Sequence, residues 1–232
     1  MKYLTTEEKE LLFREIYKDE GIHRKRNIAI FELAKYCAFR ASEITNLQMS
    51  YYDRGTATIY CKRLKGSNSN TLELVNPRVY NALNDYLDER VSKGISSPYL
   101  FISQKGTPIS RQRMDVMMKE YCRKAKYISP EKWHMHTLRH TRAIELIELG
   151  FDIDDVQFWL GHKNIENTLK YLDYTPALKR TLFSKLALFE GENISYLNTM
   201  DNKKEQQLSK NERQIINFYE KNRTSRTRKK KS

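Results

Sequence analysis

Apolar residues recur at helical spacing along most of this chain of 232 residues. Near the N-terminus, Thr5 and Glu8 form a capping-box pattern, and Leu4 is placed to pack on the first turns, so the pattern predicts a helix start. A second helix is predicted from about Asn27, after a basic break at residues 23–26. It is apolar on more than one face, so we expect it at the centre of the core.

The spacing of apolar residues changes from helical to strand-like after Tyr51. Residues 56–61 and 71–75 have the composition and alternation of strands. Between them, residues 62–70 form a basic turn rich in Gly, Asn and Ser. The pattern predicts a small antiparallel sheet of two or three strands rather than an α/β core.

Helical spacing returns after the second predicted strand. Asn76 is a predicted cap because proline, which is favoured in the first turn of a helix, follows it. Ser110 is expected to cap the next helix, and Gly150 to end a later one. Two short helices are then predicted, one ending at Gly161 and one over residues 164–171. The predicted fold class is therefore α+β, mostly α-helical, with a small antiparallel sheet.

One main domain is expected over residues 1–190, because a chain of this length that is 39% hydrophobic can form one good core. A last amphipathic helix is predicted around residues 182–188. Residues 191–232 are expected to form a polar linker that could include a short helix, followed by a basic tail. Residues 221–232 contain several Lys and Arg and neither Asp nor Glu, so we expect disorder until the tail meets a polyanion.

The formal net charge is +13 and the pI is near 9.5. Such an excess favours a polyanionic partner, and nucleic acid is preferred over an anionic membrane because no lipid-facing helix is predicted. No apolar run approaches the ~18 residues that span a bilayer, and the N-terminus lacks the apolar core of a signal peptide. Cys37, Cys61 and Cys122 are widely spaced in apolar contexts, which indicates reduced thiols in a cytoplasmic protein.

Residues 136–140 place His136, Arg139 and His140 on one face of a helix. A guanidinium is a planar fork of donors that suits phosphate oxygens, and imidazole can donate or accept a proton near neutral pH. The same face could equally be an ordinary solvated basic surface. A zinc site with His134 is a further option, but no Cys or carboxylate stands at the usual ligand spacing, and Arg139 would place a positive charge beside the ion.

His162 follows Gly161, and Tyr171 stands nine residues after His162. A glycine at this point allows a tight turn that could bring the imidazole into a pocket. Taken alone, His162 fits a capping or core histidine, and Tyr171 fits a packed aromatic residue in a chain with 15 tyrosines. Their spacing from the earlier cluster favours a shared site.

The order of these motifs resembles that of the tyrosine recombinase family, also called phage-type integrases. The resemblance covers roughly residues 4–174, which correspond to the catalytic domain of the family. Residues 38–44, Ala-Phe-Arg-Ala-Ser-Glu-Ile, are similar to the family's Gly-Leu-Arg-x-Ser-Glu-Leu motif. This match implies that Arg40 is the first catalytic arginine and Glu43 its supporting acid. Ala38 stands where the family usually has glycine.

The other family motifs follow along the chain. The family's hairpin lysine falls in the turn between the two strands, where Lys65 fits best and Lys62 is the alternative. Residues 136–139 fit the His-x-x-Arg box, residues 160–162 fit the Leu-Gly-His box, and Tyr171 stands where the family has its nucleophile. The resemblance implies the catalytic residues Arg40, Lys65, His136, Arg139, His162 and Tyr171, with Glu43 and His140 in support.

The resemblance implies site-specific cleavage and rejoining of DNA strands through a 3′-phosphotyrosyl intermediate, with no cofactor and no metal. The two arginines would stabilise the charge that grows on the phosphoryl oxygens, and Tyr171 would form the covalent bond. Lys65 is the candidate general acid for the departing 5′ oxygen. His136 would act as acid or base, and His162 would hydrogen-bond a phosphoryl oxygen.

Double-stranded DNA is the expected partner, bound mainly through its phosphates. The family implies a homo-tetramer on paired DNA sites, in which residues 182–188 would dock on a neighbouring protomer, and accessory DNA-binding proteins could take part. The family's usual N-terminal DNA-binding domain is expected to be absent. The alternatives are a catalytically idle DNA-binding regulator of the same fold, a relaxing enzyme like the type IB topoisomerases, and a metal-dependent nuclease. The basic residues predicted to contact DNA are Arg24, Lys25, Arg26, Lys62 and Arg63.

Overall fold

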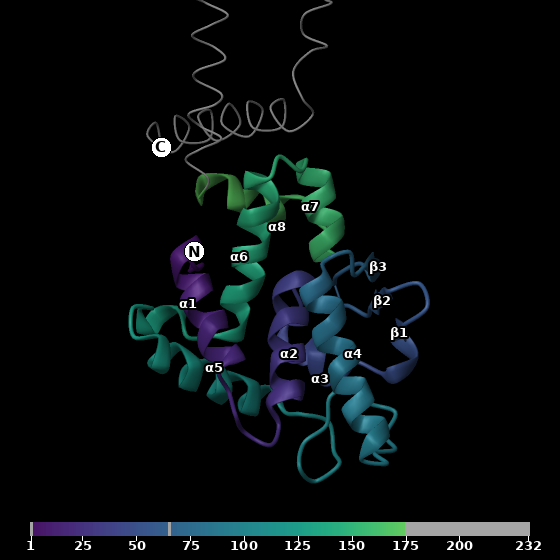
Figure 1. The fold of residues 1–232 in the computed structure, drawn as a ribbon. Helices are drawn as coiled ribbons and strands as arrows, with labels where there is room; N and C mark the ends of the chain where they lie inside the picture. Colours follow the sequence, from purple (N-terminus) through teal and green to yellow (C-terminus); the bar gives the residue numbers. More distant parts are fainter. Residues whose placement is uncertain (1, 65, 175–232) are drawn as a thin grey trace, which may run out of the picture. The chain divides into compact units, whose positions relative to one another are not determined.

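A computed structural model describes residues 2–64 and 66–174 of the chain. Figure 1 shows their helices and strands, coloured along the sequence. These residues divide into two compact units. The first unit holds residues 2–143 together with Phe158–Lys163. The second holds Ile144–Gln157 and residues 164–174. The predicted helix at residues 182–188, the linker and the basic tail lie outside the described residues, so the predicted domain boundary at residue 190 stays a prediction.

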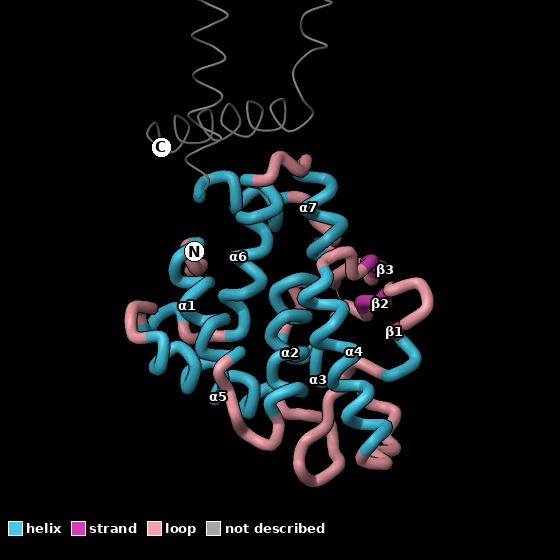
Figure 2. Tube along the Cα trace, viewed as in Figure 1, coloured by secondary structure: helices cyan, strands magenta, loops and turns pink. Residues whose placement is uncertain are grey.

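The described part of the chain is mostly helical, and its three strands form one small sheet (Figure 2). Two helices, α6 and α7, each contribute residues to both units. The α-helices are α1 (Thr6–Tyr17), α2 (Arg24–Tyr36), α3 (Ala41–Thr45), α4 (Pro77–Ser92), α5 (Arg111–Ala125), α6 (Met135–Glu148), α7 (Ile153–Leu160) and α8 (Glu166–Leu169). The 3-10 helices are η1 (Met49–Tyr51), η2 (Pro130–Lys132) and η3 (Lys170–Tyr174), and the strands are β1 (Tyr52–Asp53), β2 (Thr58–Cys61) and β3 (Asn70–Glu73).

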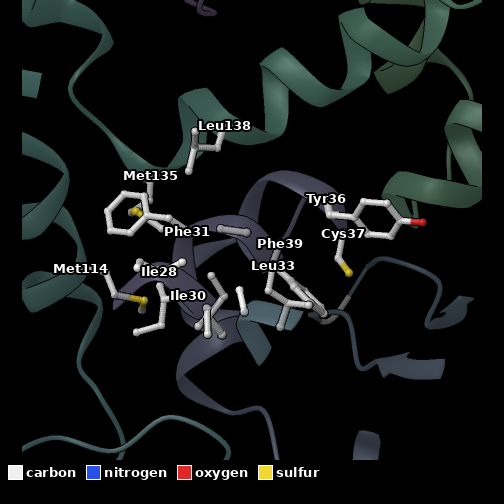
Figure 3. Close-up of a cluster of buried hydrophobic side chains, with 14 of the residues drawn as sticks. Ile28, Ile30, Phe31, Leu33, Tyr36, Cys37, Phe39, Met114, Met135 and Leu138 are labelled. Carbon is white, nitrogen blue, oxygen red and sulfur yellow. The ribbon is translucent and has the colours of Figure 1, made fainter. Parts of the chain in front are cut away.

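Helix α2 is the centre of the first unit, as its apolar pattern predicts. It packs against α4, α1 and α3, while α5 packs against α1 (Figure 1). Its apolar side chains include Phe31 and Leu33, which are fully buried. Figure 3 shows these residues beside Met114 of α5 and Leu138 of α6 in one apolar cluster. This core fixes the helices whose ends carry the candidate site.

Three predicted helix starts have the expected capping bonds. Thr5 and Glu8 form the reciprocal capping box of α1. Asn76 caps α4, with its side chain accepting a bond from the backbone of residue 78 at 2.9 Å, and proline opens the helix. Ser110 caps α5 in the same way, accepting from Arg113 N at 3.1 Å. Polar side chains therefore satisfy backbone donors that a helix N-terminus leaves unpaired.

The sheet is antiparallel in the order β1-β2-β3. Strands β2 and β3 pair with Ile59 opposite Leu72 and Cys61 opposite Asn70. The strands are shorter than the ranges predicted for them, and β1 adds the optional third strand. Burial alternates along β2 and continues past its end, so that Arg63 is buried between exposed neighbours. This alternation matters for the site, because it turns Arg63 toward the interior.

In the second unit, α6 ends at Glu148, and Gly150 follows as the predicted stop residue. Gly150 has φ of +88°, and its N–H donates to Ile147 O at 3.0 Å. The next N–H, of Phe151, donates to Leu146 O at 3.0 Å. These two bonds form the Schellman arrangement, which favours glycine at the left-handed position.

Two element predictions need correction. The basic residues 23–26 do not form a break, because α2 already begins at Arg24. The helix predicted over residues 164–171 is divided into the short α8 and the 3-10 helix η3. Within residues 2–64 and 66–174, no helix is both long and apolar enough to cross a membrane.

Candidate active site

Arg40 is the N-cap residue of α3 and is tied to Glu43 one turn later. The Arg40 backbone N–H donates to Glu43 Oε2 at 2.9 Å, and Arg40 Nη1 donates to Glu43 Oε1 at 2.7 Å. A longer bond of 3.3 Å joins Nη1 to Ser67 Oγ. The Arg40 side chain is still 27% exposed. The side chain therefore has surface that a ligand can reach, while Glu43 holds the orientation of the guanidinium.

Glu43 is a fully buried carboxylate between two guanidinium groups. In addition to its bonds with Arg40, it accepts a bond from Arg63 Nη1 at 3.2 Å. Burial alone would raise the pKa of Glu43, but Arg63, the bonds from Arg40 and the charge of Arg139 together lower it. Glu43 is thus ionised at neutral pH, which suits its predicted role as a supporting acid.

Arg139 extends from α6 and is almost fully buried, with 1% of its surface exposed. Its Nη1 donates to Ala38 O and its Nη2 to Leu160 O, both at 2.7 Å. Ala38 precedes the Arg40 motif by two residues, and Leu160 precedes the Gly161-His162 pair. The guanidinium therefore joins the two motifs on either side of it.

Gly161 and His162 pack on the turn between β2 and β3, here called the hairpin turn (described residues 62–64 and 66–69). Asn68 N donates to Gly161 O at 2.9 Å, and Ser67 and His162 form an isolated antiparallel bridge. Gly161 has φ of +68°, and a Cβ atom there would lie only 2.4 Å from Asn68 O. Glycine is required by both the backbone conformation and this close approach. The tight turn predicted at Gly161 is present.

Three histidines surround the arginines. His136 and His140 lie one turn apart on α6, with ring centroids 4.3 Å apart. Desolvation and the charges of nearby groups lower the pKa of His136, that of His140 to about 4 and that of His162 to about 3. For His162 the charges include Arg139 and Arg40. The three rings are therefore neutral at pH 7, and each can donate one hydrogen bond and accept another.

The zinc alternative finds no support in residues 2–64 and 66–174. No three His, Cys, Asp or Glu side chains in this part of the chain are grouped so that they could hold a metal ion. His136 instead has His140 as a ring neighbour and lies in the field of Arg139.

The basic residues predicted to contact DNA fall into two groups. Arg24, Lys25 and Lys62 are exposed. Arg26 and Arg63 are buried, each 6% exposed. Arg26 Nη1 donates to the carbonyl of residue 102 at 2.9 Å, and all the described bonds of Arg63 are likewise internal. The structure therefore does not present Arg26 or Arg63 to DNA at its surface, because both guanidinium groups donate to oxygen atoms inside the protein.

Two predicted catalytic residues are not among the described residues of the first unit. Lys65 lies outside the described residues, while its alternative Lys62 is exposed in the hairpin turn. Tyr171 belongs to the second unit, on the 3-10 helix η3, and is 2% exposed. Of the predicted set, the first unit thus brings together Arg40, Glu43, His136, Arg139, His140 and His162.

The family model described as the phage integrase family matches residues 2–177, which is most of the chain. The chain belongs to the phage integrase family. Among its relatives in this integrase family is the type 1 fimbriae regulatory protein FimB of Escherichia coli (strain K12), which is 36% identical over 170 residues, 73% of this chain and 82% of FimB. The tyrosine recombinase XerC of Caldanaerobacter subterraneus is 31% identical over 73% of this chain and 46% of XerC.

Solved structures of recombinases show the same fold. The XerA recombinase superposes with a TM-score of 0.68 at 27% identity, over 79% of this chain and 62% of XerA. The XerH site-specific recombinase superposes with a TM-score of 0.64 at 23% identity, a level that shows the fold alone. The chain therefore has the tyrosine recombinase catalytic fold, α-rich with a small antiparallel sheet. It spans about half the length of XerC and most of the length of FimB.

Three groups in the site were missed by the sequence reasoning. The carbonyls of Ala38 and Leu160 hold Arg139, but backbone acceptors leave no residue pattern. Arg63 was assigned to DNA, although the alternation of Ile59, Cys61 and Arg63 would have placed it on the buried face of β2. The alternation of buried and exposed residues, which continues past the end of β2, was the signal that could have identified Arg63 as a buried residue.

Proposed function

We propose that this chain cleaves and rejoins DNA strands at specific sites, with Tyr171 forming a 3′-phosphotyrosyl intermediate. The observation that supports this most directly is the grouping of two arginines, three neutral histidines and a buried carboxylate in the first unit. A phosphodiester under attack accumulates negative charge on its oxygens, and a preorganised guanidinium pair stabilises such charge. Membership of the integrase family supports a tyrosine nucleophile, for which Tyr171 is the candidate.

Arg40 and Arg139 are the proposed phosphate-binding arginines. Arg40 already has an exposed part, while Glu43 occupies another edge of its guanidinium. Arg139 is 1% exposed, so a phosphate can reach it only after the residues that cover it move. DNA binding is therefore expected to be accompanied by a local rearrangement that uncovers Arg139, while its bonds to two backbone carbonyls hold the guanidinium in place.

The histidines are proposed to transfer protons and to donate hydrogen bonds during the reaction. A neutral His136 can accept the phenol proton of Tyr171 or return a proton, which is the behaviour of a general base and acid. His162 is proposed to donate a hydrogen bond to a phosphoryl oxygen, and His140 to support His136 through their ring contact. Lys65 is the proposed general acid that protonates the departing 5′ oxygen. Rejoining needs no external energy source, because the phosphotyrosyl bond keeps the energy of the broken phosphodiester.

Double-stranded DNA is the proposed partner. The XerH recombinase was solved bound to a difH substrate, and a lambda integrase dimer bound to a COC′ core site. In this chain, Arg24, Lys25 and Lys62 are exposed basic residues suited to phosphate contacts. We also propose a homo-tetramer on paired DNA sites, a cytoplasmic location, and accessory DNA-binding proteins as further partners.

The covalent intermediate gives a direct test that works even when the DNA site has not been defined. The full chain is expressed in cells that carry its coding locus with the flanking DNA, recovered under denaturing conditions without crosslinker, and the attached DNA is sequenced. Wild type should retain short DNA ends from a defined sequence. Mass spectrometry should place a nucleotide on Tyr171 through a phosphate. Tyr171→Phe should retain none, and an adduct in that variant would refute the proposal.

A nicked suicide substrate built on the recovered sequence then separates the alternatives. Accumulated adduct on this duplex but not on a scrambled one supports a site-specific recombinase. Binding without an adduct from intact protein favours an idle DNA-binding regulator. Relaxation of supercoiled plasmid without sequence preference favours a topoisomerase-like enzyme, and cleavage that disappears with EDTA favours a metal-dependent nuclease.

A further inference from the structure

The Arg63 side chain is fully buried and bonds to four separate elements. Nη1 donates to Glu43 Oε2 of α3 at 3.2 Å, and Nε donates to Asn70 Oδ1 of β3 at 3.3 Å. Nη2 donates to two carbonyl oxygens, Cys37 O at the end of α2 at 3.0 Å and Trp159 O of α7 at 2.7 Å. A planar guanidinium can serve all these acceptors at once because its donors are fixed in different directions.

Arg63 and Arg139 hold the same two chain segments at adjacent carbonyls. Arg63 bonds to the carbonyls of residues 37 and 159, and Arg139 to those of residues 38 and 160. The first segment leads into Arg40, and the second leads into His162. Any displacement of Arg63 would therefore shift the backbone that holds Arg139.

Arg63 also determines the electrostatic state of Glu43. Arg63, Arg40 and Arg139 lower the pKa of this carboxyl group. The Glu43 charge in turn acts to raise the pKa of His136. Two of the guanidinium groups bond to it directly. Without Arg63, the carboxylate would remain buried with one direct cationic partner instead of two, and burial would then favour its neutral form. A neutral Glu43 would hold Arg40 less firmly.

We infer that Arg63 is a positioning residue for DNA cleavage, which keeps Glu43 ionised against Arg40 and fixes the segments that hold Arg139 and His162. Its Nε, Nη1 and Nη2 atoms all donate to oxygen atoms inside the first unit, so it is not expected to contact DNA. The inference rests on the proposed function for its catalytic consequence, but its effect on Glu43 can be measured without any reaction.

The first measurement is a carbon-13 NMR titration of the glutamate carboxyls in the full chain. The Glu43 signal is assigned by its loss in Glu43→Gln. In Arg63→Met, which keeps an unbranched apolar side chain but removes the charge, the pKa of Glu43 should rise by at least about 1 relative to wild type. Arg54→Met is the matched control, because Arg54 is an exposed arginine paired with Asp88 at 2.6 Å. It should leave the Glu43 titration unchanged.

The second measurement is the rate of adduct formation on the suicide substrate across pH. Folded Arg63→Met should cleave about 10- to 100-fold more slowly than wild type, the scale expected when catalytic groups are slightly misplaced. Its DNA affinity should stay within about twofold, since Arg63 makes no phosphate contact. The acidic limb of its pH profile should move to higher pH, and the double variant with Glu43→Gln should lose that movement. Arg63→Lys should keep the pKa of Glu43 low but cleave more slowly than wild type, because ammonium lacks the planar fork.

Wild-type cleavage by a folded Arg63→Met overturns the inference, whatever the pKa of Glu43. If Arg63→Met does not fold, as judged by circular dichroism, Arg63→Lys decides: slower cleavage at unchanged DNA affinity supports the inference, and wild-type cleavage overturns it. If wild type itself forms no adduct, the proposed function fails instead. The NMR titration then still decides whether Arg63 controls Glu43, and an unchanged pKa in Arg63→Met overturns that control.

Discussion

Arg139 Nη1 donates to the carbonyl of Ala38 at 2.7 Å, and Ala38 has φ of +53°. Left-handed backbone is unfavourable for an alanine by about 1–2 kcal/mol. The tyrosine recombinase motif that residues 38–44 resemble usually has glycine at this position. The same backbone conformation therefore explains both the family glycine and the strain in this chain, and it presents an acceptor to a proposed phosphate-binding arginine.

Replacing Ala38 by glycine should change the free energy of unfolding by less than about 1 kcal/mol. Relief of the left-handed strain, about 1–2 kcal/mol, opposes the loss of a buried methyl group, about 0.8 kcal/mol, and the greater backbone entropy of unfolded glycine. Ala38→Val should instead destabilise by about 3 kcal/mol, because a β-branched residue combines left-handed strain with overpacking at a site with no exposed surface. Urea denaturation of both variants measures these differences.

The control for Ala38→Gly is Ala29→Gly. Ala29 is equally buried, at 1% exposure, but lies inside α2, where glycine gains no strain relief. It should destabilise by about 1–2 kcal/mol, from the helix preference of alanine and the lost methyl group. Equal losses in the two glycine variants would contradict the strain at Ala38.

Gly161→Ala should destabilise the protein far more than Gly106→Ala, although both glycines have positive φ. A Cβ at Gly161 would meet Asn68 O at 2.4 Å and Arg63 Cγ at 2.8 Å, whereas a Cβ at Gly106 meets nothing within 4 Å. We expect a loss of about 3 kcal/mol at Gly161, where strain and overpacking add, and about 1 kcal/mol at Gly106. Thermal unfolding compares the stabilities of the two variants. Similar melting temperatures would show that the hairpin turn shifts at little energetic cost to accept a Cβ at residue 161.

The helices and the sheet were predictable because their signals are local. The caps at Thr5, Asn76 and Ser110 and the glycine end of α6 each satisfy backbone groups within one turn, so the residue types suffice to locate them. The start of α2 was not predictable from charge. Arg24 opens the helix, and Arg26 is buried by a bond to a carbonyl 76 positions later, which no local pattern encodes.

The residue types of the site were predictable, but the hydrogen bonds that hold its arginines in place were not. The motifs around Arg40, Arg139 and His162 follow from order and spacing, since the chemistry requires cations and proton carriers near a phosphate. The bond from Arg139 to Ala38 O joins positions 101 apart in the chain, and the bond from Arg63 to Trp159 O joins positions 96 apart. Such contacts exist only once the fold is formed, so sequence spacing carries no trace of them.

The stability of the protein should fall as the pH drops below about 6.5, partly because of His162. Burial and nearby arginines lower the pKa of His162 to about 3 in the folded state, so between that value and the unfolded value of 6.5 the unfolded chain binds more protons. Lowering the pH from about 7.5 to about 5 should remove about 2 kcal/mol through this residue. Urea denaturation at both pH values should show a smaller loss for His162→Asn than for wild type. An equal loss would mean that His162 titrates normally in the folded protein.

The salt dependence of DNA binding should distinguish exposed basic residues from buried ones. Each phosphate contact releases condensed counterions, so removing one should reduce the slope of log affinity against log salt by about 1. Lys25→Ala and Lys62→Ala should each do so, because both side chains are exposed on the first unit. Arg54→Ala should not, since Arg54 is already paired with a carboxylate at 2.6 Å. Fluorescence anisotropy over about 50–200 mM salt measures the slopes. A variant that loses a phosphate contact releases fewer counterions from the DNA, so its slope must fall. Unchanged slopes for both lysine variants would therefore show that DNA does not contact α2 or the hairpin turn at these positions.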